Sequence, residues 1–172
     1  RVAEDIAMMD VMSGGRIISG FVLGTGMEYH SYGINPATAR ERFWEAHDLI
    51  IKSWTERGPF EWQGKHFHIP YVNPWPRPLQ QPHPPIWLPG AASLETIEAA
   101  AKNKYTFMQV FSPRKALARA AQGYYEAAEK FGYKADPTQI AATVQMYVAE
   151  TDKQARRVAR VVAGRDRAAR TD

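Results

Sequence analysis

The chain has 172 residues and a formal net charge of +4, and 45% of its residues are hydrophobic. This length and composition predict a globular protein with a buried core and argue against a disordered chain. No stretch approaches the roughly 20 uninterrupted apolar residues of a membrane span. The chain has no cysteine, which excludes disulfides, thiolate metal sites and a cysteine nucleophile and is typical of a cytoplasmic protein.

The positive charge is concentrated at the end of the chain. Residues 153–172 carry seven basic and two acidic side chains, and no aromatic residue lies among them. Surfaces that bind nucleic acid combine basic side chains with aromatic ones on a folded face. We therefore expect a solvated helix or a frayed end and no nucleic-acid partner. Apolar periodicity stops at residue 163, so we expect an ordered domain at 1–163 and a disordered basic tail at 164–172.

The chain opens inside a helix, because Val2, Ile6 and Met9 recur at helical spacing and no capping residue precedes them. We therefore expect the domain to continue upstream of the first residue. Two consecutive glycines predict the end of this helix at Ser13. The mostly apolar run at 16–24 then predicts a strand that is buried on both faces.

A helix and a hairpin are predicted next. Residues 36–54 form an amphipathic helix whose apolar face consists of Phe43, His47, Ile50 and Trp54. Apolar and polar residues then alternate on both sides of Gly64, which predicts a short hairpin formed by 60–62 and 65–69.

A proline-rich segment follows the hairpin. Eight of the twelve prolines lie between residues 70 and 89. Proline donates no ladder hydrogen bond, so we expect an extended segment without regular strand pairing. Trp75 is its predicted anchor on the domain.

Strands and helices alternate through the second half of the chain. We expect strands at 86–88, 105–110 and 140–149, and helices at 94–103, at 113–131 and after a capping box of Thr151 and Gln154. Mostly apolar strands that are separated by helices imply a parallel sheet with right-handed crossovers.

Two parallel architectures fit this order, the doubly wound sheet and the closed barrel. A doubly wound dinucleotide fold requires three spaced glycines after a strand, and the segment 24–29 lacks the last of them. Four strand–helix units are about half of a (β/α)₈ TIM barrel, which takes ~250 residues. We therefore predict an α/β fold, a partial TIM barrel with the hairpin and the proline-rich segment as an insertion. Its missing half is expected mainly upstream.

The turn between the strand at 86–88 and the next helix is the strongest candidate site. Its residues are all small: Gly90, Ala91, Ala92 and Ser93. Small residues let the backbone approach a ligand, and the amides of a first helical turn have no partner within the helix. The turn therefore predicts an anion site. A capped helix without a ligand fits the same residues, because Ser93 is also a good N-cap.

Arg40 is the second candidate, near the start of the helix that follows the first strand. Loops after successive barrel strands meet at one rim, so Arg40 and the Gly90 turn are expected to face a common site. A guanidinium group suits phosphate oxygens. The alternative is a surface arginine that pairs with Glu41 or Glu45.

The histidines predict no metal site. His66 and His68 share one face of a strand without a third ligand at suitable spacing, and His47 is expected to be a core histidine. Tyr29 and His30 lie in the loop after the first strand, where barrel enzymes place active-site residues. They are therefore candidates for lining a site.

Several motifs occur in a recognisable order along the chain. They are 3–16 (AEDIAMMDVMSGGR), Tyr32-Gly33, 39–43 (ARERF), 75–80 (WPRPLQ) and 84–87 (PPIW). Together they resemble the bacterial luciferase-like monooxygenases, and the resemblance covers residues 1–150.

This resemblance implies a (β/α)₈ barrel that binds reduced FMN or the deazaflavin F420 at the carboxyl ends of its strands. The residues implied for the flavin phosphate are Arg40, Ala91, Ala92 and Ser93. Luciferase has a Glu-Ser pair at the two alanines, so backbone contacts are expected to replace side-chain ones there. The reactive loop of the family matches 22–24, which points to Gly24, with Tyr29 and His30, as residues that face the flavin or the substrate. The cysteine and arginine of luciferase are absent from that loop, which argues against light emission on an aldehyde.

The resemblance favours an FMN-dependent monooxygenase that oxidises a small organic substrate with O₂. It implies a flavin reductase as the source of electrons and a homo-oligomer. The alternatives are an F420-dependent dehydrogenase or reductase on the same barrel and a non-catalytic flavin-binding fragment. The sequence assigns no catalytic residue.

Overall fold

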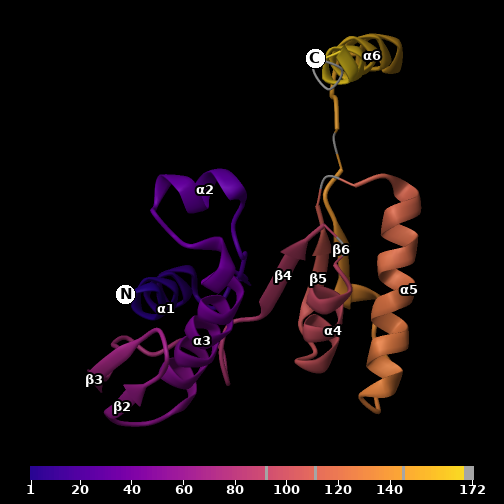
Figure 1. Ribbon diagram of the computed structural model, residues 1–172. Coiled ribbons are helices and arrows are strands. Elements are labelled where there is room, and N and C mark those ends of the chain that lie inside the picture. Colours follow the sequence, from indigo (N-terminus) through magenta and orange to yellow (C-terminus); the bar gives the residue numbers. More distant parts are fainter. Residues whose placement is uncertain (92, 111, 145, 169–172) are drawn as a thin grey trace. The chain divides into compact units, whose positions relative to one another are not determined.

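The computed structural model describes residues 1–91, 93–110, 112–144 and 146–168. The chain divides into two compact units, residues 1–142 and residues 143–172. The described elements are drawn in Figure 1. No described helix is long and apolar enough to cross a bilayer.

Four parallel strands form one sheet in the described part of the first unit. They are β1 (Ser19–Gly20), β4 (Ile86–Gly90), β5 (Thr106–Gln109) and β6 (Ile140–Ala142), in that order across the sheet. Helix α4 (Leu94–Lys102) connects β4 to β5, and α5 (Arg114–Lys130) followed by the 3₁₀ turn η1 (Pro137–Gln139) connects β5 to β6. Successive parallel strands joined by helices confirm the predicted α/β fold, a partial barrel.

Two strands are shorter than predicted. The first was expected at 16–24, but the carbonyl of Ile17 accepts a hydrogen bond from the Gln80 side chain at 2.8 Å and not from a neighbouring strand. Pairing is limited to the stretch in which Ser19 and Phe21 donate backbone hydrogen bonds to the segment of β4. At the other edge, β6 pairs only as far as β5 extends, so it ends at Ala142 and not at residue 149.

The first helix, α1 (Val2–Ser13), ends at Ser13 as predicted, and its C-cap residue Gly14 has a left-handed φ of 69°. Of the apolar repeat that predicted this helix, Ile6 packs against the core, Val2 and Met9 are about half exposed, and the buried residues are Ala3, Ala7 and Asp10. Small side chains let α1 approach α3 (Pro36–Thr55) closely. The Trp54 indole on α3 donates to the carbonyl of Ala3 at 2.9 Å.

The predicted face of α3 is confirmed. His47 and Trp54 are buried, and Phe43 and Ile50 are half-buried against the same core. Asn35 caps the helix by accepting a hydrogen bond from the amide of Ala37 at 3.0 Å. The same helix also carries Arg40, so its position fixes one half of the candidate site.

The predicted hairpin is present as β2 (Phe60–Gln63) and β3 (His68–Val72). Glu45 of α3 holds it, because its carboxylate accepts hydrogen bonds from the amides of His66 and Phe67 at 2.8 and 2.9 Å. The Trp62 indole donates to the same carboxylate at 3.2 Å.

Glycine is required at the turn of this hairpin. A Cβ atom added to Gly64 would overlap the carboxylate of Glu45. Desolvation raises the pKa of Glu45, but the hydrogen bonds from His66, Phe67 and Trp62 outweigh it and hold this pKa below its usual value. The ionised carboxylate is therefore the form that docks the hairpin.

The proline-rich segment is anchored by polar contacts and not by Trp75, whose side chain is 68% exposed. Asp10 of α1 is fully buried and accepts hydrogen bonds from the amide and the side chain of Gln80, at 2.9 and 2.7 Å. Arg77 donates to the carbonyl of Ser53 at 2.6 Å. The Trp75–Pro76 and Gln81–Pro82 peptide bonds are cis.

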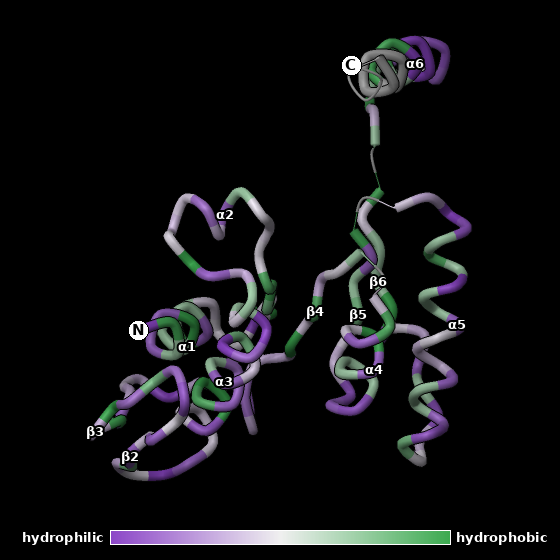
Figure 2. Tube along the Cα trace, in the orientation of Figure 1, coloured by the Kyte–Doolittle hydropathy of each residue, from purple (hydrophilic) through white to green (hydrophobic). Residues whose placement is uncertain are grey.

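The core of the first unit lies between the sheet and helices α4 and α5. Leu88 of β4 and Phe107 of β5 are buried together with Ala100 of α4 and Tyr124 of α5. Hydrophobic and hydrophilic residues alternate along α5 (Figure 2), which fits a helix with one face on the core. The Tyr124 hydroxyl donates to the carbonyl of Tyr105 at 2.8 Å.

The second unit contains α6 (Asp152–Ala168). The predicted capping box is confirmed, because the Gln154 side chain accepts from the Thr151 amide at 3.2 Å and the Gln154 amide donates to the Thr151 hydroxyl at 3.3 Å. Lys153, Arg156 and Arg160 are exposed on this helix. The expected tail at 164–172 begins within α6, and residues 169–172 lie outside the described part.

Candidate phosphate-binding site

The turn from β4 to α4 has the geometry of a capped helix start. The Ser93 hydroxyl accepts a hydrogen bond from the amide of Thr96 at 3.3 Å and donates to the Thr96 hydroxyl at 2.7 Å. The Ser93 carbonyl accepts from the amide of Ile97 at 3.1 Å. The amides of Leu94 and Glu95 precede the first helical hydrogen bond, so they have no acceptor within the helix. Ser93 is thus an N-cap, which leaves these two amides for another acceptor.

Gly90 lets the end of β4 pack closely against α4. A Cβ atom at Gly90 would already contact the Phe107 ring and the Thr96 methyl group, both at 3.4 Å. The carbonyl of Gly90 accepts from the amide of Val110 at 3.1 Å, so the turn is held by the neighbouring strand. Ala91 is exposed beside it. Ala92, the fourth predicted member of this site, lies outside the described residues.

Arg40 contacts this turn through an ion pair. Its Nη1 atom lies 2.8 Å from Oε2 of Glu95, the second residue of α4. The predicted alternative partners are engaged elsewhere, since Glu41 pairs with Lys65 at 2.8 Å and Glu45 holds the hairpin. The structure therefore brings together Arg40 and the start of α4, two features that the sequence placed at one rim.

The space beside the ion pair is small. A pocket of about 30 Å³ is lined by Phe21, Leu23, Arg40, Phe43, Trp44, Leu88, Pro89 and Thr96. This volume is comparable to that of one water molecule. A pocket of this size is too small to be assigned as the phosphate site.

The loop after β1 is held by its own contacts. Gly24 has a φ of 92°, a left-handed conformation that favours glycine. Tyr29, on the short helix α2 (Gly26–Ser31), donates from its hydroxyl to the carbonyl of Leu23 at 3.0 Å, and His30 is exposed. No hydrogen bond or ion pair among the described residues joins Tyr29 or His30 to Arg40.

His47 has structural partners. Buried His47 contacts Asp48 through Nδ1 at 2.8 Å and the Tyr105 hydroxyl through Nε2 at 3.0 Å, which confirms a core histidine. Burial, with a smaller contribution from Asp48, raises the pKa of Tyr105 to about 12, so its hydroxyl remains protonated. His66 lies 3.3 Å from Glu41. Within the described ranges, no group of three or more potential ligands could hold a metal ion.

Two residues of this region were not predicted from the sequence. Glu95 occupies the first turn of α4, a position that favours acidic residues and therefore gave no separate signal. Gln109 is buried at the end of β5 in register with Gly90, and its Oε1 atom has no hydrogen-bond partner among the described residues. In the sequence, Gln109 stands out as an amide side chain near the end of a predicted strand.

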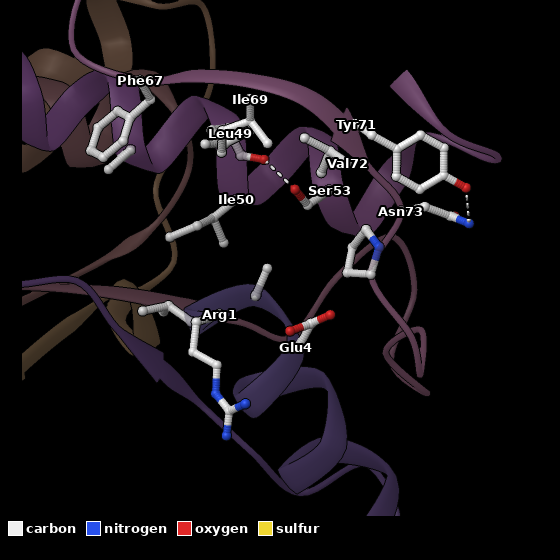
Figure 3. Close-up of a pocket in the computed structure, with 14 residues that line it drawn as sticks. Arg1, Glu4, Leu49, Ile50, Ser53, Phe67, Ile69, Tyr71, Val72 and Asn73 are labelled. Carbon is white, nitrogen blue, oxygen red and sulfur yellow. Dashed lines mark hydrogen bonds between the residues drawn. The ribbon is translucent and has the colours of Figure 1, made fainter. Parts of the chain in front are cut away.

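A larger pocket of about 570 Å³ lies between the start of α1, helix α3 and strand β3. Figure 3 shows aliphatic side chains from α3 and β3 on its walls, among them Leu49, Ile50, Ile69 and Val72. No sequence-predicted site residue lines it. Its walls carry no pair of groups arranged for acid–base or nucleophilic chemistry, so we assign no reaction to it.

The geometry defines a class of protein. An arginine and a helix start converge at the carboxyl end of a parallel strand, which is where TIM-barrel enzymes bind phosphate-bearing ligands. The luciferase-like monooxygenase family matches residues 1–171, so the chain belongs to this family and the predicted resemblance is confirmed.

One sequence relative has a described activity. The oxygenase component of a flavin-dependent trigonelline monooxygenase from Acinetobacter baylyi is 34% identical over 91 residues, which are 51% of this chain and 25% of the relative.

Solved structures show the same fold. Monooxygenase RslO1 from Streptomyces bottropensis matches with a TM-score of 0.84 and 29% identity, over 99% of this chain and 53% of that protein. The oxygenating constituent of 3,6-diketocamphane monooxygenase from Pseudomonas putida, in complex with FMN, matches with a TM-score of 0.74 and 24% identity, over 91% and 47%. An F420-dependent secondary alcohol dehydrogenase matches with a TM-score of 0.67 and 20% identity, over 82% and 42%. The chain spans about half the length of these proteins or less.

Proposed function

We propose that this chain forms the phosphate-holding part of an FMN-dependent monooxygenase. Arg40 and the first turn of α4 are its proposed phosphate ligands, with Gly90, Ala91 and Ser93 in the turn against which the phosphate lies; Ala92, which lies outside the described residues, is proposed as a further member from the sequence. The observation that carries the proposal is the 2.8 Å contact between Arg40 and Glu95. This contact supports a site in which a guanidinium group and a helix start bind the same oxyanion.

The residues present fit a flavin phosphate. The Glu95 carboxylate, itself an oxyanion, lies on the guanidinium that would bind the phosphate, so the donors are compatible with an anion at this position. Arginine presents several donors in one plane, and the helix start adds amides that have no acceptor within the helix. These groups would hold the phosphate and so orient the rest of the cofactor.

The cofactor, when bound, supplies the electrons that activate O₂. The protein contributes binding, orientation and the exclusion of water. Gly24, Tyr29 and His30 are proposed to face the flavin or the substrate, because they follow β1 at its carboxyl end. The Tyr29 hydroxyl donates a hydrogen bond to the Leu23 carbonyl, which holds the backbone of this loop in place.

The partners are a small organic substrate, O₂ and a flavin reductase. The flavin-dependent relative is the oxygenase component of its monooxygenase, and this supports a separate protein as the source of electrons.

An F420-dependent dehydrogenase or reductase is the second candidate. The likeness to an F420-dependent alcohol dehydrogenase supports it, but the identity is 20%, compared with 34% to the flavin-dependent relative over the aligned residues. Because F420 also carries a phosphate, Arg40 suits either cofactor. Titration of the intact protein with FMN and with F420 separates the two, and binding without oxygenase, dehydrogenase or reductase turnover would favour a non-catalytic role.

Replacement of Arg40 tests the phosphate site. In the intact protein, Arg40→Ala should weaken reduced FMN on the order of tenfold, because one charge-assisted contact is lost. Riboflavin lacks the phosphate, so its affinity should not change. Anaerobic titration measures both dissociation constants. Arg42→Ala is the matched control, since Arg42 lies on the same helix with its guanidinium 4.9 Å from the centre of the Phe67 ring. Equal losses for FMN and riboflavin would contradict the proposal.

A further inference from the structure

The ion pair between Arg40 and Glu95 joins two elements across the proposed phosphate site. The carboxylate belongs to the first turn of α4, and the guanidinium comes from α3. Both side chains are partly open to solvent, with 45% of Arg40 and 59% of Glu95 exposed. A ligand can therefore reach the pair without an opening of the core.

The Glu95 carboxylate already interacts with both positive features of the site, the Arg40 guanidinium and the start of α4. Its carboxylate neutralises the guanidinium at 2.8 Å, and an acidic residue in a first turn is also stabilised by the partial positive charge of the helix start. A phosphate dianion needs the same two features. Its approach places two negative groups close together if the pair stays intact, and it leaves Glu95 without its cation if the pair opens.

We propose that Glu95 competes with the cofactor phosphate for Arg40 and thereby lowers the affinity for phosphate-bearing flavin. This inference rests on the proposed function of the same site. Glu95 opposes an anion and has no such effect on a neutral ligand, so it sets the preference for FMN over riboflavin. In an oxygenase that receives reduced flavin from a separate reductase, such competition favours release of the flavin after turnover.

Glu95→Gln tests the competition. The amide keeps the size of the side chain but removes its charge. Because exposed ion pairs are weak, reduced FMN should bind the variant of the intact protein roughly two- to fivefold more tightly. Riboflavin should bind with unchanged affinity. Glu98→Gln is the matched control, because Glu98 lies on the same helix and its carboxylate is 3.9 Å from Lys130.

A double variant separates competition from a general charge effect. In an Arg40→Ala background there is no guanidinium to compete for, so the gain from Glu95→Gln should shrink. A gain of the same size in both backgrounds would overturn competition for Arg40.

The two proposals fail in different ways. If Arg40→Ala weakens FMN and riboflavin equally, the phosphate site itself is wrong. If Arg40→Ala selectively weakens FMN while Glu95→Gln leaves FMN unchanged or weakens it, the site stands and the competition is overturned, because Glu95 would then position Arg40. Circular dichroism melts of each variant confirm that the fold is retained.

Discussion

Asp10 is a fully buried carboxylate whose two oxygens accept hydrogen bonds from Gln80. The Gln80 side chain also donates to the carbonyl of Ile17 at 2.8 Å. A single amide group therefore connects α1, the chain before β1 and the proline-rich segment. The sequence predicted that this segment would be anchored but named an aromatic residue for it, because burial of an aspartate is unusual without a partner that only the structure reveals.

Gln80→Ala should destabilise the protein. The substitution removes the side-chain donor and leaves a buried carboxylate oxygen and a carbonyl unpaired, at a cost of about 1–3 kcal/mol. Urea unfolding of the wild type and the variant measures the change. Gln81→Ala is the matched control, since Gln81 is exposed and its side chain donates to the nearby carbonyl of Pro78 at 3.0 Å. Equal stability of the two variants would show that the Asp10 contact is dispensable.

The partner of Arg40 could not be predicted from local sequence. Glu41 and Glu45 are the carboxylates nearest to Arg40 along the same helix, so they were the partners considered from the local sequence. In the structure Glu41 pairs with Lys65, and Glu45 accepts hydrogen bonds from backbone amides of the hairpin. Arg40 contacts Glu95 instead. Arg40 could thus be proposed as a candidate from the sequence, whereas the residue with which it forms an ion pair depends on tertiary contacts.

At the scale of elements, helices were predicted more closely than strands. Pro36 and Asn35 at the start of α3 and Gly14 after α1 are local signals, so the ends of these helices follow from sequence. The length of a strand depends on its neighbour. The run at 16–24 is mostly apolar, but only Ser19–Gly20 forms a paired strand. The buried residues of α1 include Ala3 and Ala7, and alanine gives only a weak apolar signal in the sequence.

The docking of the hairpin on α3 should depend on pH. The pKa of Glu45 is lower in the folded protein than its usual value, so its contribution to stability is present above the ordinary glutamate pKa and is lost as the pH falls through the folded value. Glu41 contributes in the same direction, because hydrogen bonds from Lys65 and His66 lower its pKa.

Glu45→Gln should therefore lower stability at neutral pH, and the difference from wild type should disappear in acid. Urea unfolding at several values between about pH 7 and pH 3 brackets the ordinary glutamate pKa. The control is Glu61→Gln, an exposed residue of the same hairpin. A difference between wild type and Glu45→Gln that persists unchanged at the acid end would contradict the role of the ionised carboxylate.

At the scale of the whole molecule, the sheet order β1-β4-β5-β6 leaves β1 and β6 at its edges in the described first unit. One side of the strands packs on α4 and α5 through Leu88 and Phe107. The residues that alternate with these, Trp87 and Met108, lie on the other side and are only half-buried. In a closed barrel that second side faces the interior. The order of strands and helices was sufficient to predict this architecture, since parallel units of this kind have few alternatives.

The central claim is that Arg40 and the start of α4 hold the phosphate of a flavin. A crystal structure of the intact protein with reduced FMN, grown without oxygen, tests it most directly. We expect phosphate oxygens within about 2.7–3.2 Å of the Arg40 guanidinium and of an amide in the first turn of α4, with the contact between Arg40 and Glu95 lengthened or lost. A phosphate bound elsewhere, with the 2.8 Å ion pair intact, would contradict the claim.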